Sequence, residues 1–185
     1  NTIVEVVQDY ARQLKLKGKK LNQILLDIHR PENFKYEDRL RNIILFANTC
    51  SDKYNVPVRM LDFKRTTNKI NEFNIDLGKI ELIPLLSYQQ YLQNAYDSLF
   101  VISDSGTAQE ELAILDTHVI VPRDYTERWE SVKNSCSIML DVNSQNKTWD
   151  FTLAYIDYKR QIKTEWLGNG TTSDEIINII TKMYE

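Results

Sequence analysis

The feature that most constrains this chain is a regular alternation of short apolar runs with longer segments of helical period. Residues 22–28 and 56–61 are apolar runs of strand length, and 37–53 between them repeats apolar side chains at the i, i+3, i+4 spacing of one helical face. The first residues of the chain also predict a helix, whereas the pattern of 143–170 is less regular and is assigned to no element. Further strands are predicted at 80–85, 99–103, 119–122 and 137–140, and further helices at 66–73, 88–96, 107–115, 127–134 and 171–184.

This alternation predicts one fold class. Strands that alternate with helices imply right-handed βαβ crossovers and a parallel sheet with helices on both faces. We therefore predict an α/β fold, a doubly wound parallel sheet of about six strands that is Rossmann-like. In such sheets ligands bind beyond the carboxyl ends of the strands, so the residues that directly follow each strand are the candidates for function.

Composition and charge exclude several functional classes. Of the 185 residues, 42% are hydrophobic and 26% are charged, which is ordinary for a soluble globular domain. The formal net charge of -3 and the pI of about 5.5 give no support to binding of nucleic acid or of an anionic membrane. No run of about 18 apolar residues is present, so no membrane span is predicted. Cys50 and Cys136 lie in apolar stretches without CxxC spacing, which predicts two buried free thiols of a cytoplasmic protein.

Three polar clusters follow predicted strands, at 29–33, 103–111 and 123–128. Because the carboxyl ends of parallel strands lie at one edge of the sheet, we expect the three clusters to converge on a cleft. The second cluster is the most informative, since Ser105 and Gly106 would open a helix where backbone N–H groups lack partners and favour a diphosphate.

Glu111 lies inside that helix, where its carboxylate would repel phosphate but could accept hydrogen bonds from the hydroxyls of a ribose. An alternative interpretation makes Ser105 a plain N-cap and places Glu110 and Glu111 on a solvated helix face. The GxGxxG and P-loop patterns are absent, so neither NAD binding nor ATP hydrolysis is supported, and no cofactor is predicted.

The other two clusters leave alternatives open as well. His29 is either a functional group at the cleft or a residue that is simply exposed or hydrogen-bonded, and His118 is interpreted as structural. Arg128, like Arg123, either binds phosphate through its planar guanidinium or pairs with a nearby acid, Asp124 or Glu127. Two distant histidines fall short of zinc-ligand spacing, so no metal site is predicted.

Taken in order, the clusters resemble motifs of the non-hydrolysing UDP-N-acetylglucosamine 2-epimerase family. His-Arg-Pro-Glu-Asn at 29–33 matches the family's His-Arg-x-Glu-Asn, 103–111 matches its Ser-Asp-Ser-Gly-Gly-x-Gln-Glu-Glu, and 123–130 is similar to its Arg-x-x-Thr-Glu-Arg-Pro-Glu. Residues 1–4 resemble the family's interdomain linker, and 168–173 a glycine-rich stretch before its last helix. The resemblance covers 1–185 and implies the C-terminal, UDP-binding domain of a two-domain GT-B-type fold, cut from a longer chain.

The resemblance implies an isomerase of polysaccharide biosynthesis that inverts C2 of a UDP-linked acetamido sugar by elimination and re-addition of UDP. It implies as partners a UDP-sugar and an absent N-terminal domain that carries the proton-transferring carboxylates, so the chain alone would be inactive; it also allows a homodimer. The site residues it implies are Ser105, Gly106 and Thr107 at the diphosphate, Glu111 at the ribose, Arg128 on the phosphate side, Tyr91 beside the uracil, and His29 near the diphosphate as the residue needed for activity.

Two departures from the family pattern qualify this reading. Phe63 stands where the family has a histidine that contributes to a second, activating UDP-sugar site, and Thr107 replaces the second glycine of the diphosphate turn. Two rival interpretations therefore stay open: the donor-binding domain of a glycosyltransferase, which shares the architecture, and a nucleotide-sugar binding module without catalysis.

Overall fold

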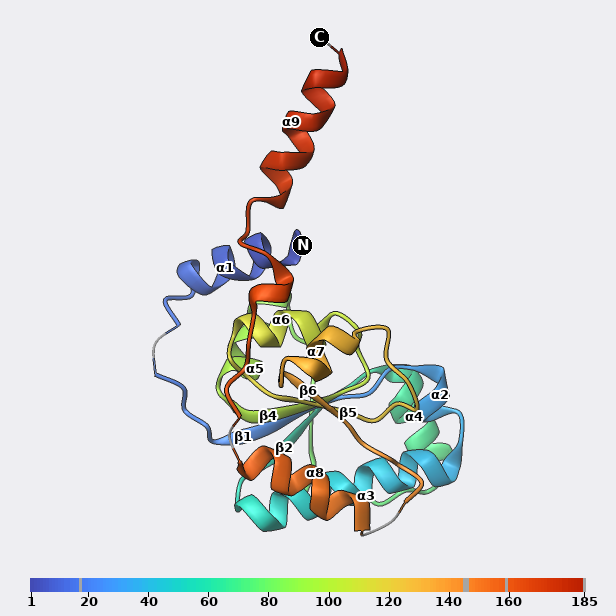
Figure 1. Cartoon of the computed structure of the whole chain (residues 1–185). Coiled ribbons are helices and arrows are strands. Elements are labelled where there is room, and N and C mark those ends of the chain that lie inside the picture. Colours follow the sequence, from blue (N-terminus) through green and yellow to red (C-terminus); the bar gives the residue numbers. More distant parts are fainter. Residues whose placement is uncertain (17, 145–146, 159, 185) are drawn as a thin grey trace.

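The computed structural model describes residues 1–16, 18–144, 147–158 and 160–184. Its centre is a six-stranded sheet in which all paired strands are parallel, in the order β3-β2-β1-β4-β5-β6 (Figure 1). This confirms the predicted doubly wound α/β fold. The strands are β1 (Gln23–Asp27), β2 (Val58–Leu61), β3 (Glu81–Ile83), β4 (Ser98–Ser103), β5 (Val119–Val121) and β6 (Ser137–Met139).

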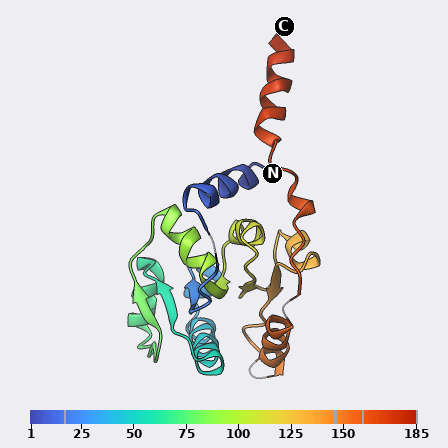
Figure 2. The same cartoon turned by 90° about the vertical axis from the view of Figure 1, so that its left-hand side faces the viewer.

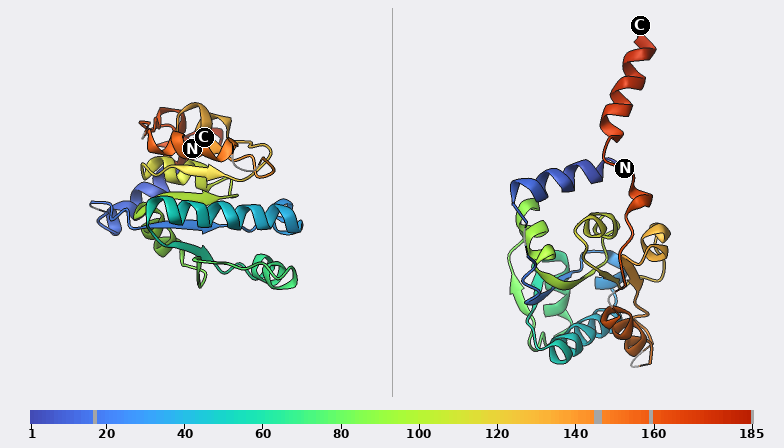
Figure 3. Two further views of the ribbon diagram at one scale, coloured as in Figure 1. Left: turned by 90° about the horizontal axis from the view of Figure 1, so that it is seen from below. Right: turned by 60° about the vertical axis from the view of Figure 1, so that its left-hand side comes forward.

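Helices cover both faces of the sheet, as Figures 2 and 3 show from the side and from below. One face packs against α5 (Tyr88–Tyr96) and α6 (Ala108–Ile114), on which α1 (Ile3–Gln13) lies in turn, and the other against α3 (Glu37–Tyr54) and α8 (Lys147–Asp157). The remaining helical segments are α2 (Pro31–Phe34), α4 (Lys64–Glu72), α7 (Trp129–Lys133), the 3-10 turn Glu165–Leu167 and α9 (Thr172–Tyr184).

Two apolar cores follow from this layering. In β1, Ile24 and Leu26 belong to the core beneath α3, and Leu25 belongs to the core beneath α1, α5 and α6. Successive strand residues point to opposite faces, so a strand covered on both faces must be apolar throughout. All three side chains have no exposed surface, which explains why the sequence shows continuous apolar runs rather than alternation.

The less regular stretch 143–170, which the sequence assigned to no element, contains α8 and a 3-10 turn. Trp149, Leu153 and Ile156 recur at helical spacing and are buried against the core that also contains α3. Several residues between them are also apolar, so the helical spacing does not stand out in the sequence. Tertiary packing decides which of these side chains are buried. The short helix α2 was missed too, although Pro31 at its first position favours a helix start.

The order of the strands places a switch point between β1 and β4. The chain runs outward from β1 through β2 to β3, and then returns to β4 on the other side of β1. The connections that leave β1 and β4 therefore diverge, which opens a crevice at their carboxyl ends. His29 follows β1 and Ser105 follows β4, so the two polar clusters flank this crevice.

The last helix, α9, extends away from the body and buries none of its residues (Figure 1). Its base lies beside the first residue, because the amino group of Asn1 donates hydrogen bonds to the Leu167 carbonyl at 3.0 Å and to Thr172 Oγ1 at 2.9 Å. No helix in the described ranges is long and apolar enough to cross a membrane. Cys50 and Cys136 are buried free thiols, as predicted.

Candidate functional site

A cavity of about 360 Å³ lies at the carboxyl edge of the sheet, at the β1/β4 switch point. The sequence predicted that three polar clusters would converge on one cleft, but only the cluster 103–111 lines this cavity. Residues of the other two clusters, Arg30 and Glu32 with Arg123 and Asp124, line a separate cavity of about 260 Å³. Ser105, Thr107, Glu111 and Tyr91 all line the cavity at the switch point, so four of the predicted site residues lie together. Its lining also includes Asp27, Leu61, Phe63, Leu85, Leu86 and Tyr88.

The turn Ser105–Thr107 forms one wall of the cavity. It precedes α6 rather than opening it, since Ala108 is the first helical residue and Thr107 occupies the N-cap position. The backbone N–H of Ser105 donates to Ser103 Oγ at 3.1 Å, and the hydroxyls of Ser105 and Thr107 are 3.1 Å apart. Within the described ranges, no hydrogen bond engages the backbone N–H of Gly106 or Thr107. The turn therefore offers two hydroxyls and two amide donors to an anion.

Gly106 keeps room for a carboxylate as well as for a ligand. A Cβ at this position would lie 3.0 Å from Glu127 Oε1, a tight contact that would push the end of the Glu127 side chain aside by a few tenths of an ångström. Arg123 holds Glu127 through Nη1 at 2.9 Å, and Arg30 Nη2 lies 3.9 Å from Glu127 Oε1. Glycine at this position therefore leaves this ion-pair cluster undisturbed.

Glu110 and Glu111 are not on a solvated helix face, so that alternative was wrong. Their exposed fractions are only 8% and 6%. Tyr88 Oη donates to Glu111 Oε1 at 3.0 Å. Burial raises the pKa of Glu111, and the Tyr88 hydrogen bond opposes that rise. A carboxylate kept in an apolar wall with one donor has acceptor capacity left for the hydroxyls of a ligand.

Arg128 has a different partner from those that the sequence suggested. Its Nε lies 3.0 Å from Glu110 Oε1, so it pairs with the buried Glu110. It is outside the lining of the cavity, and its role toward phosphate stays a prediction. Arg123 pairs with Glu127, as the sequence allowed, and also with Glu32. Asp124 pairs with Arg39 at 2.9 Å.

Two tyrosines of α5 form the wall opposite the turn. The helix starts with a capping box, in which Ser87 and Gln90 exchange hydrogen bonds between side chain and backbone. Tyr88 and Tyr91 are three positions apart and therefore share a face of α5, which is turned toward the cavity. The Tyr91 hydroxyl oxygen is buried and has no hydrogen-bond partner among the described residues. An aromatic ring with a free polar tip suits a planar ligand with hydrogen-bonding edges.

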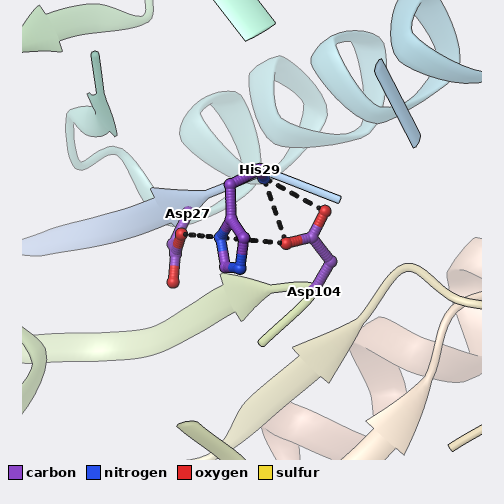
Figure 4. Close-up of side chains that lie close together, drawn as sticks. All are labelled: Asp27, His29 and Asp104. Carbon is purple, nitrogen blue, oxygen red and sulfur yellow. Dashed lines mark hydrogen bonds and ion pairs between the residues drawn. The ribbon is translucent and has the colours of Figure 1, made fainter. Parts of the chain in front are cut away.

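His29 lies between two buried aspartates, Asp27 and Asp104, as Figure 4 shows. It is not among the residues that line the cavity, although Asp27 is. His29 Nδ1 lies 2.9 Å from Asp27 Oδ1 and 3.3 Å from Asp104 Oδ1. The hydrogen bond with Asp27 raises the pKa of His29, and burial opposes that rise. The ring also packs on Phe63, with the ring centroids 5.0 Å apart. His29 is therefore a held, half-buried group, not a free surface residue.

Asp27, His29 and Asp104 are also the described residues whose spacing could suit a metal, with ligand atoms within 4.8 Å of one another. Asp104, however, already accepts from the backbone N–H of His29 and Arg30 and from Asn33 Nδ2. Since Asp104 is fully engaged and Asp27 binds the imidazole, the cluster fits a hydrogen-bonded histidine, and we assign no metal to it. His118 precedes β5 and lies at the opposite edge of the sheet from His29.

Three site residues escaped the sequence reasoning: Asp27, Asp104 and Tyr88. Asp27 had a usable signal, because it is the acidic end of an apolar strand two positions before His29, and residues two apart in extended backbone share a side. The roles of Asp104 and Tyr88 had no such signal, since their partners lie 75 and 23 positions away.

Comparison with known proteins shows the family of this chain. A sequence model described as UDP-N-acetylglucosamine 2-epimerase matches residues 1–181. The chain belongs to the UDP-N-acetylglucosamine 2-epimerase family. The UDP-N-acetylglucosamine 2-epimerase of Methanocaldococcus jannaschii is 30% identical over 162 residues, which cover 85% of this chain and 44% of that protein. That of Salmonella borreze is 29% identical over 174 residues, 86% of this chain and 44% of the relative.

Solved structures of epimerases in this family share the fold. A crystal structure of the M. jannaschii UDP-GlcNAc 2-epimerase in complex with UDP-GlcNAc and UDP matches with a TM-score of 0.85 and 28% identity, covering 98% of this chain and 53% of that one. An E. coli heptosyltransferase, at 14% identity and a TM-score of 0.52, shares the fold alone. The chain thus spans about half the length of the epimerases that it matches.

Proposed function

We propose that this chain is the UDP-binding, C-terminal half of a UDP-N-acetylglucosamine 2-epimerase. The whole enzyme would interconvert UDP-GlcNAc and UDP-ManNAc, or a related UDP-acetamido sugar, by elimination and re-addition of UDP. The proposal rests on the cavity at the β1/β4 switch point, in which a hydroxyl- and amide-rich turn faces two tyrosines across a buried glutamate. Membership of the epimerase family favours this function over the donor domain of a glycosyltransferase.

Each wall of the cavity has a part in holding UDP. The free amides of Gly106 and Thr107, with the Ser105 hydroxyl, would bind the diphosphate. Glu111 would accept from the ribose hydroxyls, and Tyr91 would lie beside the uracil. These contacts hold UDP after it leaves the sugar and keep it in place for re-addition, which is the positional contribution to catalysis.

The proton at C2 needs a base, and the proposal places the carboxylates that move it outside this chain. His29 would contribute a positive charge near the diphosphate as UDP departs. Positioning without the proton-transferring group leaves most of the barrier in place. We therefore expect the purified chain of 185 residues to show no epimerisation of UDP-GlcNAc. Turnover above a control without enzyme would contradict this assignment.

Binding of UDP to the chain alone tests the site directly. One wall of a two-walled cleft should bind UDP weakly, with a Kd of roughly 0.1 to 10 mM. In an NMR titration the amides of Ser105, Gly106 and Glu111 should shift. A second cavity of about 500 Å³ at the opposite edge of the sheet, lined by residues that include Lys19 and His118, provides the internal control. Shifts confined to that cavity would refute the proposed site.

Arg128 tests whether the phosphate side of the site extends beyond the cavity. Arg128→Ala should weaken UDP binding by about 1.5 to 3 kcal/mol if the guanidinium swings to the phosphate. The same substitution leaves the buried Glu110 without its ion-pair partner, so the double variant Arg128→Ala, Glu110→Gln serves as the matched control. If the double variant binds UDP as well as the wild type, the loss in the single variant comes from Glu110, and Arg128 has no phosphate role.

A further inference from the structure

Asp27 is a buried carboxylate that the proposed UDP contacts do not use. It ends β1, is 5% exposed, and lines the cavity beside Ser105. Its Oδ1 lies 2.9 Å from Nδ1 of His29, and its Oδ2 accepts from Ser103 Oγ at 2.9 Å. Both oxygens are therefore engaged, one by the histidine and one by the last residue of the neighbouring strand. A buried carboxylate fixed at both oxygens can hold an imidazole in one orientation.

Asp104 has mainly a different task. Its carboxylate accepts from the backbone N–H of His29 at 3.1 and 3.2 Å, from the backbone N–H of Arg30 at 2.9 Å, and from Asn33 Nδ2 at 2.9 Å. Asp104 thus holds the backbone that follows β1, and its Oδ1 also lies 3.3 Å from His29 Nδ1, whereas Asp27 makes the closer contact with the ring at 2.9 Å (Figure 4). Among the described residues, hydrogen bonds and ion pairs reach the imidazole only at Nδ1, so Nε2 is left for a ligand.

We propose that Asp27 is a positioning residue, which binds His29 at Nδ1 and thereby gives Nε2 to the bound nucleotide. The identity of that nucleotide rests on the proposed function, but the geometry of the pair does not. In the neutral imidazole the proton sits on Nδ1, where Asp27 accepts it. In the imidazolium the second proton sits on Nε2, where it can be donated to a phosphate oxygen.

The charges around the ring favour the imidazolium. Asp27 and Asp104 face it from the ends of β1 and β4, and Arg30 follows it in the chain and opposes its protonation. From α4 and the residues before it, the uncharged ring of Phe63 packs on it. The hydrogen bond to Asp27 is the largest influence on the pKa of His29 and raises it. Loss of this hydrogen bond should therefore lower the pKa of His29.

Histidine NMR on the chain tests the pair without requiring UDP. The chain has only two histidines, so His118 at the far edge of the sheet is a built-in control. Asp27→Asn keeps the shape and should move the titration midpoint of His29 to lower pH. Asp27→Leu also removes the acceptor, and the neutral ring should lose its preference for the Nδ1–H tautomer. Asp97→Asn, a buried aspartate (6% exposed) at the amino end of β4, should leave His29 unchanged.

A titration and tautomer of His29 that are the same in the wild type and in a folded Asp27→Asn protein would overturn the proposal. The Asn variant decides this even if the Leu variant fails to fold. Chemical shifts of residues outside the cavity report whether each variant is folded.

UDP affinity as a function of pH gives the second readout. At pH 7 Asp27→Asn should bind UDP about tenfold more weakly than the wild type, because less of its His29 is charged. At pH 5 the two proteins should differ by less, since a larger fraction of His29 is charged in both than at pH 7, and Asp97→Asn should follow the wild type throughout. A loss of equal size at both pH values would mean a structural role and overturn the proposal. If the wild type itself binds no UDP, the proposed function fails, and histidine NMR still decides the role of Asp27.

Discussion

The rim of the cavity and helix α9 depart from the usual distribution of side chains in opposite directions. At the rim, Asp27, Asp104 and Glu111 are charged or chargeable groups with 5%, 0% and 6% of their surface exposed. On α9, by contrast, Ile177 and Ile180 are 60% and 50% exposed, although they are among the most apolar side chains of the chain. Neither arrangement gives this chain by itself the lowest free energy of folding.

The two regions differ in whether these unusual side chains have interaction partners. Each buried carboxylate at the rim has named partners, such as Tyr88 for Glu111 and Asn33 for Asp104. No residue of α9, by contrast, is buried within the described part of the chain. The first region is therefore integrated into the stability of the fold, and the second should be nearly independent of it.

Removal of the Asp104 carboxylate should have the largest effect. Asp104→Ala leaves two backbone N–H groups and Asn33 buried without an acceptor, so we expect a loss of about 3 kcal/mol in the free energy of unfolding. Urea denaturation measures it. Asp174→Ala on α9 is the matched control, since that exposed carboxylate should contribute less than about 1 kcal/mol. Equal losses would erase the distinction between the two regions.

Substitution of Glu111 should change the free energy of unfolding by an intermediate amount, and it should stabilise the protein where Asp104→Ala destabilises it. Because burial raises the pKa of Glu111, the folded protein binds this proton more tightly than the unfolded chain does. Stability from this group therefore increases as the pH falls through the folded-state pKa, and it is lowest when Glu111 is charged. Glu111→Gln should raise the free energy of unfolding at pH 7 by about 0.5 to 1 kcal/mol and flatten its dependence on pH in the acidic range.

The same Glu111→Gln protein should discriminate less between UDP and 2′-deoxy-UDP, as a ribose contact requires. Calorimetric titration of both nucleotides measures this. A Glu111→Gln protein that is destabilised at pH 7 would contradict the unfavourable burial of the Glu111 charge. A protein that keeps the full discrimination would contradict the ribose contact.

Substitutions on α9 should have the smallest effect. Ile177→Ser and Ile180→Ser remove side chains that bury nothing in this chain, so each should change the free energy of unfolding by less than about 0.5 kcal/mol. Leu112→Ala, at a side chain with no exposed surface, is the positive control and should cost about 2 to 5 kcal/mol. A loss above 1 kcal/mol from either isoleucine variant would show that α9 packs on the body in solution.

Most of the fold could be predicted because its signals are local. The run Ile24–Leu26 must be a strand covered on both faces, and Asn55 ends α3 in the left-handed conformation, with φ 53°, that such a residue tolerates. The exception is α8. Trp149 and Leu153 are buried only because the sheet provides a surface for them, and no local pattern reports that surface.

The site could be predicted as a place, but only partly as a set of contacts. Strand ends located Ser105 and Glu111 correctly at the cavity. The partner of Arg128 could not be deduced, since its choice of Glu110 over Glu127 depends on how the loop after β5 folds back on α6. Tertiary geometry decides which charged side chains pair at the carboxyl edge of the sheet. The strand pattern already decides which residues lie at that edge.

The pairing of β1 with β4 also fixes when the site can come into being. Asp27 and Ser103, which pair across these strands, are separated by 76 positions, so the ribosome makes Asp27 long before its partner. Until β4 emerges, that side of β1 has no neighbour, and its backbone is open to wrong pairing. A nascent chain stopped before Ser103 holds His29 without Asp104, and the imidazole gains its surroundings only when the middle of the sheet closes.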